Sequence, residues 1–125
     1  MTKRILIVED DYDILCILTD LLNGEGYEVA GINYTDSIVG SVLQHQPDLV
    51  ILDFLLPGIN GGELCHDLKT NEKTAELPVI LISGYPRLVE SLGSYGSDGF
   101  IAKPFDIDAV LHLVESCLSH RTELV

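Results

Sequence analysis

Four short apolar runs constrain this chain most, because each ends abruptly in a charged or hydroxyl-bearing residue. The runs occupy residues 5–8, 49–52, 79–82 and 100–102, and they lead into Glu9, Asp53, Ser83 and Lys103. Runs this short and this uniformly apolar are typical of strands in a parallel sheet that is covered on both faces. We therefore expect an α/β fold whose polar residues gather at the carboxyl ends of the strands.

Segments of helical periodicity alternate with these runs, and a weaker strand is expected over residues 27–32. Apolar residues recur at helical spacing near residues 14–22, 38–43, 64–68, 88–92 and 107–118. The fourth of these helices is expected to be short, because Gly93, Gly96 and Gly99 crowd its end. The pattern predicts a flavodoxin-like (βα)5 doubly wound parallel sheet with strand order 2-1-3-4-5.

Length and composition exclude several classes of protein. A chain of 125 residues, 46% of them hydrophobic, can bury one core, so we expect a single domain over residues 1–125. No apolar run approaches the roughly 18 residues that span a bilayer. The apolar run after the basic residues Lys3 and Arg4 is only four residues long and leads into acidic residues, unlike that of a signal peptide. A cytoplasmic protein without membrane contact is expected. The net charge of -13 argues against direct nucleic-acid binding.

The cysteines and histidines are interpreted as structural. Cys16, Cys65 and Cys117 fall on apolar faces of predicted helices, where a free thiol behaves as a small hydrophobe, so all three are expected in the core. Neither an HExxH pattern nor CxxC partners accompany the four histidines. Solvated helix positions are therefore expected for His45, His66, His112 and His120.

The predicted strand order places the first and third strands side by side, and so brings Asp10 close to Asp53. Two carboxylates about 4 Å apart repel by roughly 4 kcal/mol at an effective dielectric constant near 20, and Glu9 adds to that field. A divalent cation would relieve the repulsion. Only oxygen ligands are present, so Mg²⁺ or Mn²⁺ fits better than zinc. With Asp53 as nucleophile and Lys103 as a neutralising cation, the pattern indicates a magnesium-dependent phosphoryl-accepting site.

Four motifs stand in order at the predicted strand ends. They are LIVEDD at residues 6–11, DLVILDFLLPG at 48–58, ISG at 82–84 and KPF at 103–105. Together they resemble the receiver domain of two-component response regulators, over essentially the whole chain. The resemblance implies that Asp53 accepts a phosphoryl group from the histidine of a sensor histidine kinase or a histidine phosphotransfer protein. It also implies that Glu9, Asp10, Asp53 and the carbonyl of Leu55 serve Mg²⁺.

The resemblance assigns further roles near the acceptor. Lys103 would pair with one phosphoryl oxygen, and the Ser83 hydroxyl would bond to another after a short movement. Phe100 would be the aromatic residue that rotates when Ser83 moves. A cis bond before Pro104 is likewise a family expectation. Homodimer formation on phosphorylation is compatible with the resemblance, whereas the downstream effector is left open.

The lifetime of the phosphoryl group is expected to depend on Leu55 and Tyr85, two places beyond Asp53 and Ser83. Both side chains are bulky, and neither carries a carboxylate or amide suited to orienting the attacking water. Slow self-dephosphorylation is therefore expected. Such a protein would be a phosphoacceptor switch and not an enzyme.

Other readings of the same residues stay open. A flavin or nucleotide binder on this fold would need a glycine or hydroxyl loop after the first strand, where this chain has three carboxylates. An interaction module that is never phosphorylated would normally have lost some of the site residues. A phosphatase would need a general acid, and none is evident beside Asp53. The acidic cluster could also be only a solvated loop in which Asp11 caps the first helix.

Overall fold

The computed structural model describes residues 2–85, 87 and 95–123. Strands and helices alternate along the chain, as the apolar runs predicted. The elements are β1 (Arg4–Val8), α1 (Tyr12–Gly24), β2 (Glu28–Ile32), α2 (Ile38–His45), β3 (Leu49–Asp53), β4 (Leu55–Leu56), β5 (Ile59–Asn60), α3 (Gly61–Thr70), β6 (Val79–Ser83), β7 (Gly99–Ala102) and α5 (Ile107–Glu123).

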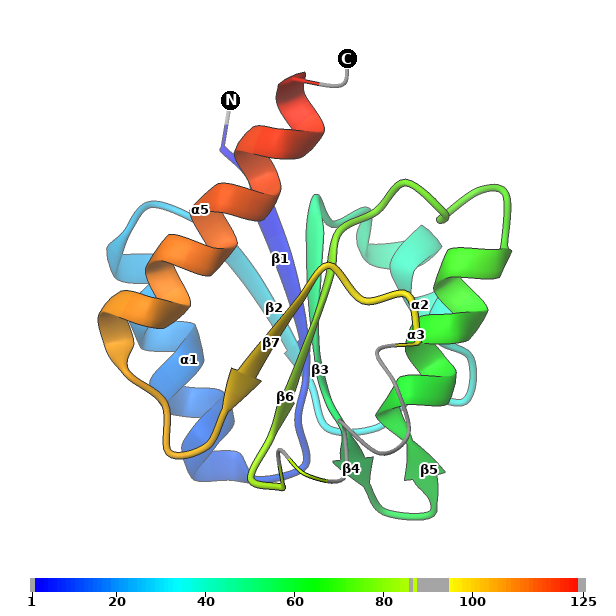
Figure 1. The fold of residues 1–125 in the computed structure, drawn as a ribbon, viewed down its shortest axis with the longest axis horizontal. Coiled ribbons are helices and arrows are strands. Elements are labelled where there is room, and N and C mark those ends of the chain that lie inside the picture. The colour runs from blue at the N-terminus through cyan, green and yellow to red at the C-terminus, as the bar shows by residue number, and fades with distance from the viewer. Residues whose placement is uncertain (1, 86, 88–94, 124–125) are drawn as a thin grey trace.

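The main sheet is parallel and has five strands in the order β2-β1-β3-β6-β7 (Figure 1). This order is the predicted 2-1-3-4-5, with β6 and β7 as the fourth and fifth strands. The register places Val8 opposite Leu52, and Asp53 opposite Ile82. Glu9 and Asp10 therefore leave the sheet beside Asp53. The flavodoxin-like fold is confirmed.

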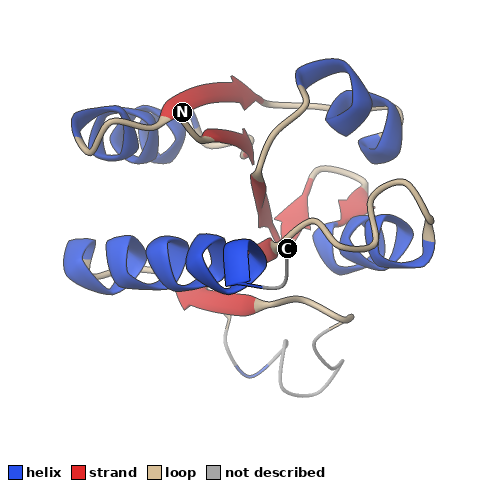
Figure 2. Cartoon of the chain, turned by 90° about the horizontal axis from the view of Figure 1, so that it is seen from above, coloured by secondary structure: helices blue, strands red, loops and turns tan. Residues whose placement is uncertain are grey.

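Helices cover both faces of this sheet, with α1 and α5 on one side and α2 and α3 on the other (Figures 1 and 2). Alternate residues of the strands point to opposite faces of the sheet and pack into two separate hydrophobic cores. Leu6, Leu52 and Leu81 pack toward α2 and α3, whereas Ile7, Ile51 and Ile80 pack toward α1 and α5. Because β3 and β6 are buried along their whole length, they must be apolar until their final residues.

Side-chain caps fix where the helices begin. Asp11 accepts hydrogen bonds from the N–H groups of Asp13 and Ile14, which confirms Asp11 as the cap of α1. Ser37 caps α2 through the N–H of Gly40, and Asn60 caps α3 through the N–H of Gly62. The start of α1 is thus tied to the loop that carries the first acidic residues of the predicted site.

The structure corrects part of the cysteine prediction. Cys65 is buried, but Cys16 and Cys117 are only half-buried, because their helix positions lie at the border of the apolar stripe. The prediction of a core position therefore holds fully for Cys65 alone. The predicted fourth helix, with Leu88 and Leu92, lies outside the described residues.

Two further local features differ from the sequence expectation. A small antiparallel hairpin of β4 and β5 lies between Asp53 and α3, and its turn has Gly58 at φ 71°. His45 is half-buried instead of solvated, and it lines a hollow between the end of α2 and the first residues of β1 and β2. Within the described ranges, no helix combines the length and the apolar character that crossing a bilayer requires.

Candidate functional site

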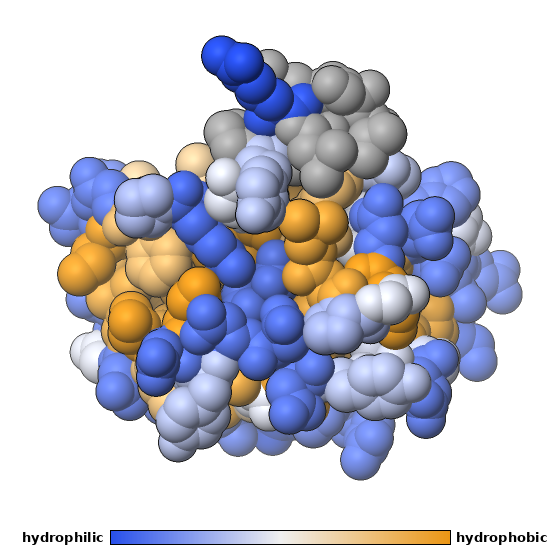
Figure 3. Space-filling view, turned by 90° about the horizontal axis from the view of Figure 1, so that it is seen from below, coloured by the Kyte–Doolittle hydropathy of each residue, from blue (hydrophilic) through white to orange (hydrophobic). Residues whose placement is uncertain are grey.

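The carboxyl ends of the central strands bring three acidic side chains together. One carboxylate oxygen from each of Glu9, Asp10 and Asp53 lies within 4.8 Å of the others. Figure 3 shows this edge of the molecule, where hydrophilic residues gather at the centre with hydrophobic ones on either side. The sequence prediction that Asp10 and Asp53 adjoin is confirmed. All three residues offer oxygen ligands, the donors that Mg²⁺ prefers.

Glu9 is fully buried, which is unusual for a carboxyl group. Its Oε1 accepts a hydrogen bond of 3.1 Å from the N–H of Asp11. Its Oε2 is paired with the Lys103 ammonium but accepts no hydrogen bond of good geometry from the described residues. Burial, followed by the neighbouring Asp53, raises the pKa of Glu9 from 4.5 to about 7. A buried oxygen with unused acceptor capacity, beside two more carboxylates, fits a cation ligand.

Lys103 bridges the two buried carboxylates. Its Nζ lies 3.1 Å from Glu9 Oε2 and 3.3 Å from Asp53 Oδ2. Burial by itself would lower the pKa of Lys103, but Glu9 and Asp53 outweigh burial and raise it. The backbone N–H of Lys103 donates to the carbonyl of Ser83, and the bond to Pro104 is cis, as the family resemblance implied. The two ion pairs therefore hold the positive charge of Lys103 at Asp53.

Ser83 and Leu55 flank Asp53 through local turns. Ser83 is buried at the end of β6, and its Oγ accepts a hydrogen bond of 2.9 Å from the N–H of Tyr85. No hydrogen bond joins Ser83 to Asp53 in the described part of the chain. The N–H of Leu55 donates to Asp53 Oδ1 at 3.2 Å, so it orients the carboxylate. Leu55 and Tyr85 are 45% and 62% exposed, so both residues are accessible to solvent.

Phe100 lies in β7 opposite Leu81 and is half-buried. Its side chain packs against the core between the sheet and α2 and α3. Phe100 therefore lies in the strand next to that of Ser83, but it is not part of the acidic cluster.

Sequence reasoning missed Gly61, the first residue of α3. A Cβ at this position would collide with the backbone carbonyl of Asp53 and crowd Phe54. The N–H of Gly61 donates to the carbonyl of Phe54 at 2.8 Å, so the helix begins directly against the loop that follows Asp53. The Gly-Gly pair signalled a tight turn, but nothing local could show which backbone it approaches.

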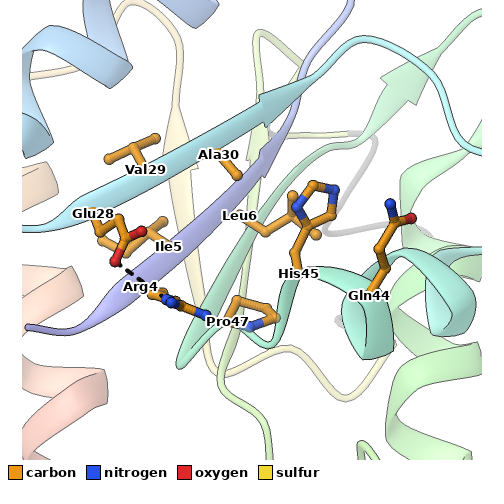
Figure 4. Close-up of a pocket in the computed structure, with 9 residues that line it drawn as sticks. All are labelled: Arg4, Ile5, Leu6, Glu28, Val29, Ala30, Gln44, His45 and Pro47. Atoms are coloured by element: carbon orange, nitrogen blue, oxygen red, sulfur yellow. Dashed lines mark hydrogen bonds and ion pairs between the residues drawn. The ribbon is translucent and has the colours of Figure 1, made fainter.

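A pocket of about 250 Å³ lies at the opposite end of the sheet, between the first residues of β1 and β2 and the end of α2 (Figure 4). His45 and Pro47 border it, and the Arg4 guanidinium at its rim is paired with Glu28 at 3.2 Å. The pocket has no contact with the acidic cluster. It is therefore separate from the candidate site.

The family of the chain follows from comparison with known proteins. A family model described as the response regulator receiver domain matches residues 5–115. The response regulator TrrA of Thermotoga maritima, solved in complex with Mg²⁺-BeF, is 30% identical, with a TM-score of 0.83 over 93% of this chain and 99% of that one. The chain belongs to the receiver domain family of response regulators, the phosphoacceptors of two-component systems.

Two relatives show how the chain compares with longer regulators. It is 34% identical to the DNA-binding dual master transcriptional regulator RpaA of Synechocystis sp., covering 98% of this chain and 51% of RpaA. It is 36% identical to the DNA-binding response regulator MtrA of Mycolicibacterium paratuberculosis, covering 84% of this chain and 46% of MtrA. The chain thus spans about half the length of these relatives.

Proposed function

We propose that Asp53 is the phosphoacceptor of this receiver domain and that Mg²⁺ assists the transfer. The observation that carries the proposal is the meeting of three carboxylates within 4.8 Å of one another, with the Lys103 ammonium 3.3 Å from Asp53. Glu9, Asp10, Asp53 and the Leu55 carbonyl would hold the cation. Bound there, Mg²⁺ would neutralise charge on the transferred phosphoryl oxygens.

The protein's own residues supply position and charge. An Asp53 carboxylate oxygen attacks phosphorus, so that a P–O bond forms while the P–N bond of the donor phosphohistidine breaks and the imidazole leaves. A carboxylate is a weak nucleophile, which makes the orientation imposed by the Leu55 N–H important. Lys103 offsets negative charge that arrives on the acceptor. The donor would be a sensor histidine kinase or a histidine phosphotransfer protein.

The switch is proposed to begin at Ser83. Its hydroxyl would donate to a phosphoryl oxygen, a charge-assisted bond worth roughly 1.5–3 kcal/mol. An energy of that size shifts a two-state equilibrium by about tenfold or more. Phe100, in the strand β7 that leads into Lys103, would follow by rotating. The protein would then act as a switch that slowly dephosphorylates itself, and not as an enzyme on an external substrate.

Mass spectrometry tests the assignment of the acceptor. Incubation with phosphoramidate and Mg²⁺ should add one phosphoryl group of about 80 Da to Asp53 and nowhere else, because this carboxylate lies among the proposed cation ligands beside Lys103 and is oriented by the Leu55 N–H. Asp53→Asn should abolish labelling, whereas Asp20→Asn, on the exposed face of α1, should not change it. Equal labelling of Asp53→Asn, or labelling that persists with the metal chelated, would contradict the proposal.

A further inference from the structure

Tyr95, shortly before β7, packs directly on the segment that follows Asp53. Its ring centroid lies 5.9 Å from that of Phe54, with the two planes at 54°. Phe54 is completely buried and is the next residue after the acceptor. On its other side the Tyr95 ring covers Gly62, where an added Cβ would come within 2.5 Å of ring carbons. The ring therefore fills the space between Phe54 and the start of α3.

The backbone around Tyr95 is held in place by α3. Tyr95 has φ 54°, a left-handed conformation that non-glycine residues seldom adopt unless their surroundings hold them there. The Cys65 thiol donates to the Tyr95 carbonyl at 3.5 Å. Three residues later, Asp98 pairs with Lys69 at 2.6 Å and accepts a hydrogen bond from the N–H of Val79. These contacts fix the direction in which the ring points.

Phe54 links this packing to the chemistry of the site. The N–H of Gly61 donates to its carbonyl at 2.8 Å, and the next residue, Leu55, donates from its N–H to Asp53 Oδ1 at 3.2 Å. A displacement of Phe54 would therefore turn both the Asp53 carboxylate and the Leu55 carbonyl. Aromatic pairs in this geometry resist such displacement, because tilted rings have favourable contacts of their own.

We propose that Tyr95 is a positioning residue for phosphoryl acceptance, which acts by holding Phe54 and the start of α3 against the acceptor loop. The inference rests on the proposed function of Asp53 and adds a residue from a distant part of the chain. Tyr95 touches neither the cation ligands nor the phosphoryl position. Its effect is on the orientation of the groups that do.

The test compares Tyr95→Ala with Tyr95→Phe and Tyr27→Ala. Tyr27 is also half-buried but packs against the core on the α1 and α5 side, so its truncation is a matched loss of packing away from the site. We expect Tyr95→Ala to weaken apparent Mg²⁺ affinity on the order of tenfold, the lower end for groups that support a metal ligand. The labelling rate at saturating phosphoramidate and Mg²⁺ should fall as well. Tyr95→Phe keeps the ring. This variant and Tyr27→Ala should have Mg²⁺ affinities and labelling rates within about twofold of those of the original chain.

A double-variant cycle tests the contact between the Tyr95 ring and residue 62, and its single variant Gly62→Ala tests the inference even if Tyr95→Ala folds poorly. Gly62→Ala should weaken Mg²⁺ affinity while Tyr95 is present, because the new methyl displaces the ring, and should have little further effect in the Tyr95→Ala background. The methyl also lies 3.0 Å from Asn60 Oδ1, a contact that is the same in both backgrounds. Additive effects of Gly62→Ala and Tyr95→Ala on Mg²⁺ affinity would overturn the inference. An equal loss of affinity in Tyr95→Ala and Tyr27→Ala would overturn it as well. Failure of the proposed function would be distinct, since the original chain itself would then show no Mg²⁺-dependent labelling.

Discussion

Glu9 illustrates how one residue takes its properties from its surroundings. Its carboxyl group is fully buried beside Asp53, and its only cationic neighbour in the described part of the chain, Lys103, is shared with that same aspartate. Desolvation and a like charge both favour the protonated acid. The metal-free protein therefore carries a carboxyl group that ionises near neutral pH, although aqueous glutamate ionises well below it.

This environment predicts a pH dependence of stability. The pKa of Glu9 in the folded protein is raised from 4.5 to about 7, so the folded state keeps this proton in a range where the unfolded chain has released it. The stabilising contribution is complete below about pH 4.5 and is lost as the pH rises through about 7. With metal chelated, the unfolding free energy should fall over this window by at most roughly 3 kcal/mol.

Urea unfolding of the original chain and of Glu9→Gln, measured at several pH values with a chelator, isolates this contribution. Glu9→Gln should show a flatter profile between about pH 4.5 and 7, since other titrating groups are common to both proteins. Parallel profiles of the two proteins would mean that Glu9 ionises normally in the folded state.

The exposed pair Leu55 and Tyr85 predicts a long-lived phosphoryl group. Their backbone N–H groups bond to Asp53 and Ser83, and their side chains are exposed. Neither side chain has a carboxylate or amide suited to orienting the attacking water. Misplacing a nucleophile by about 1 Å can cost roughly a hundredfold in rate. After donor removal, Leu55→Asn and Tyr85→Glu should lose the label faster than the original chain, as followed by mass spectrometry. Unchanged decay in both variants would reject this role, and assistance from the Tyr85 hydroxyl would appear as slower decay in Tyr85→Phe.

At the scale of elements, the start of α3 depends on close backbone approach. Gly61 faces the carbonyl of Asp53 so closely that no side chain fits between them. The helix is also capped there by Asn60. The loop that follows Asp53 and the helix thus form one tightly packed unit, in which a single methyl group would force the chain to move.

Gly61→Ala should therefore destabilise the protein and displace Asp53, the proposed phosphoacceptor. Overpacking of this kind lowers the free energy of unfolding by about 1–3 kcal/mol. Displacement of the Asp53 backbone should also slow the labelling of Asp53 by phosphoramidate. Gly24→Ala is the matched control, because it lies at the end of α1 with nothing within 4 Å of an added Cβ. Chemical denaturation compares the two, and an equal effect of both substitutions would refute the close approach at Gly61.

For the whole molecule, the concentration of negative charge at one edge of the sheet couples stability to cation binding. The chain has a net charge of -13, and three carboxylates meet where the central strands end. Figure 3 shows a polar centre on this edge, with apolar patches on either side. A cation that binds only the folded state shifts the folding equilibrium by mass action.

Mg²⁺ should raise the melting temperature. At a Mg²⁺ concentration a hundred times its Kd, the free energy of unfolding should rise by roughly 2.7 kcal/mol. Asp10→Asn should stabilise the metal-free protein, because it removes local repulsion, and should reduce the Mg²⁺ effect. Asp20→Asn changes the net charge equally but lies away from the cluster, so it should leave the Mg²⁺ effect intact. Melting that is independent of both Mg²⁺ and residue 10 would show that the carboxylates do not share a cation.

Much of this arrangement follows from the sequence alone. The uniformly apolar runs predicted the strands, because a strand buried on both faces has no polar positions until it ends. Right-handed crossovers then leave few strand orders, and the flavodoxin-like order placed Asp10 beside Asp53. Lys103 was assigned to the same edge for the same reason. These are consequences of local pattern and connectivity, which the sequence contains.

Tertiary structure alone decided how these groups interact. Three features of the site depend on distances between segments far apart in the chain. They are the sharing of Lys103 between Glu9 and Asp53, the raised pKa of Glu9, and the approach of Gly61 to the Asp53 carbonyl. The left-handed backbone of Tyr95 and its packing on Phe54 are of the same kind. Periodicity shows which face of an element is buried, but burial depth, charge coupling and ring contact arise only when the elements pack.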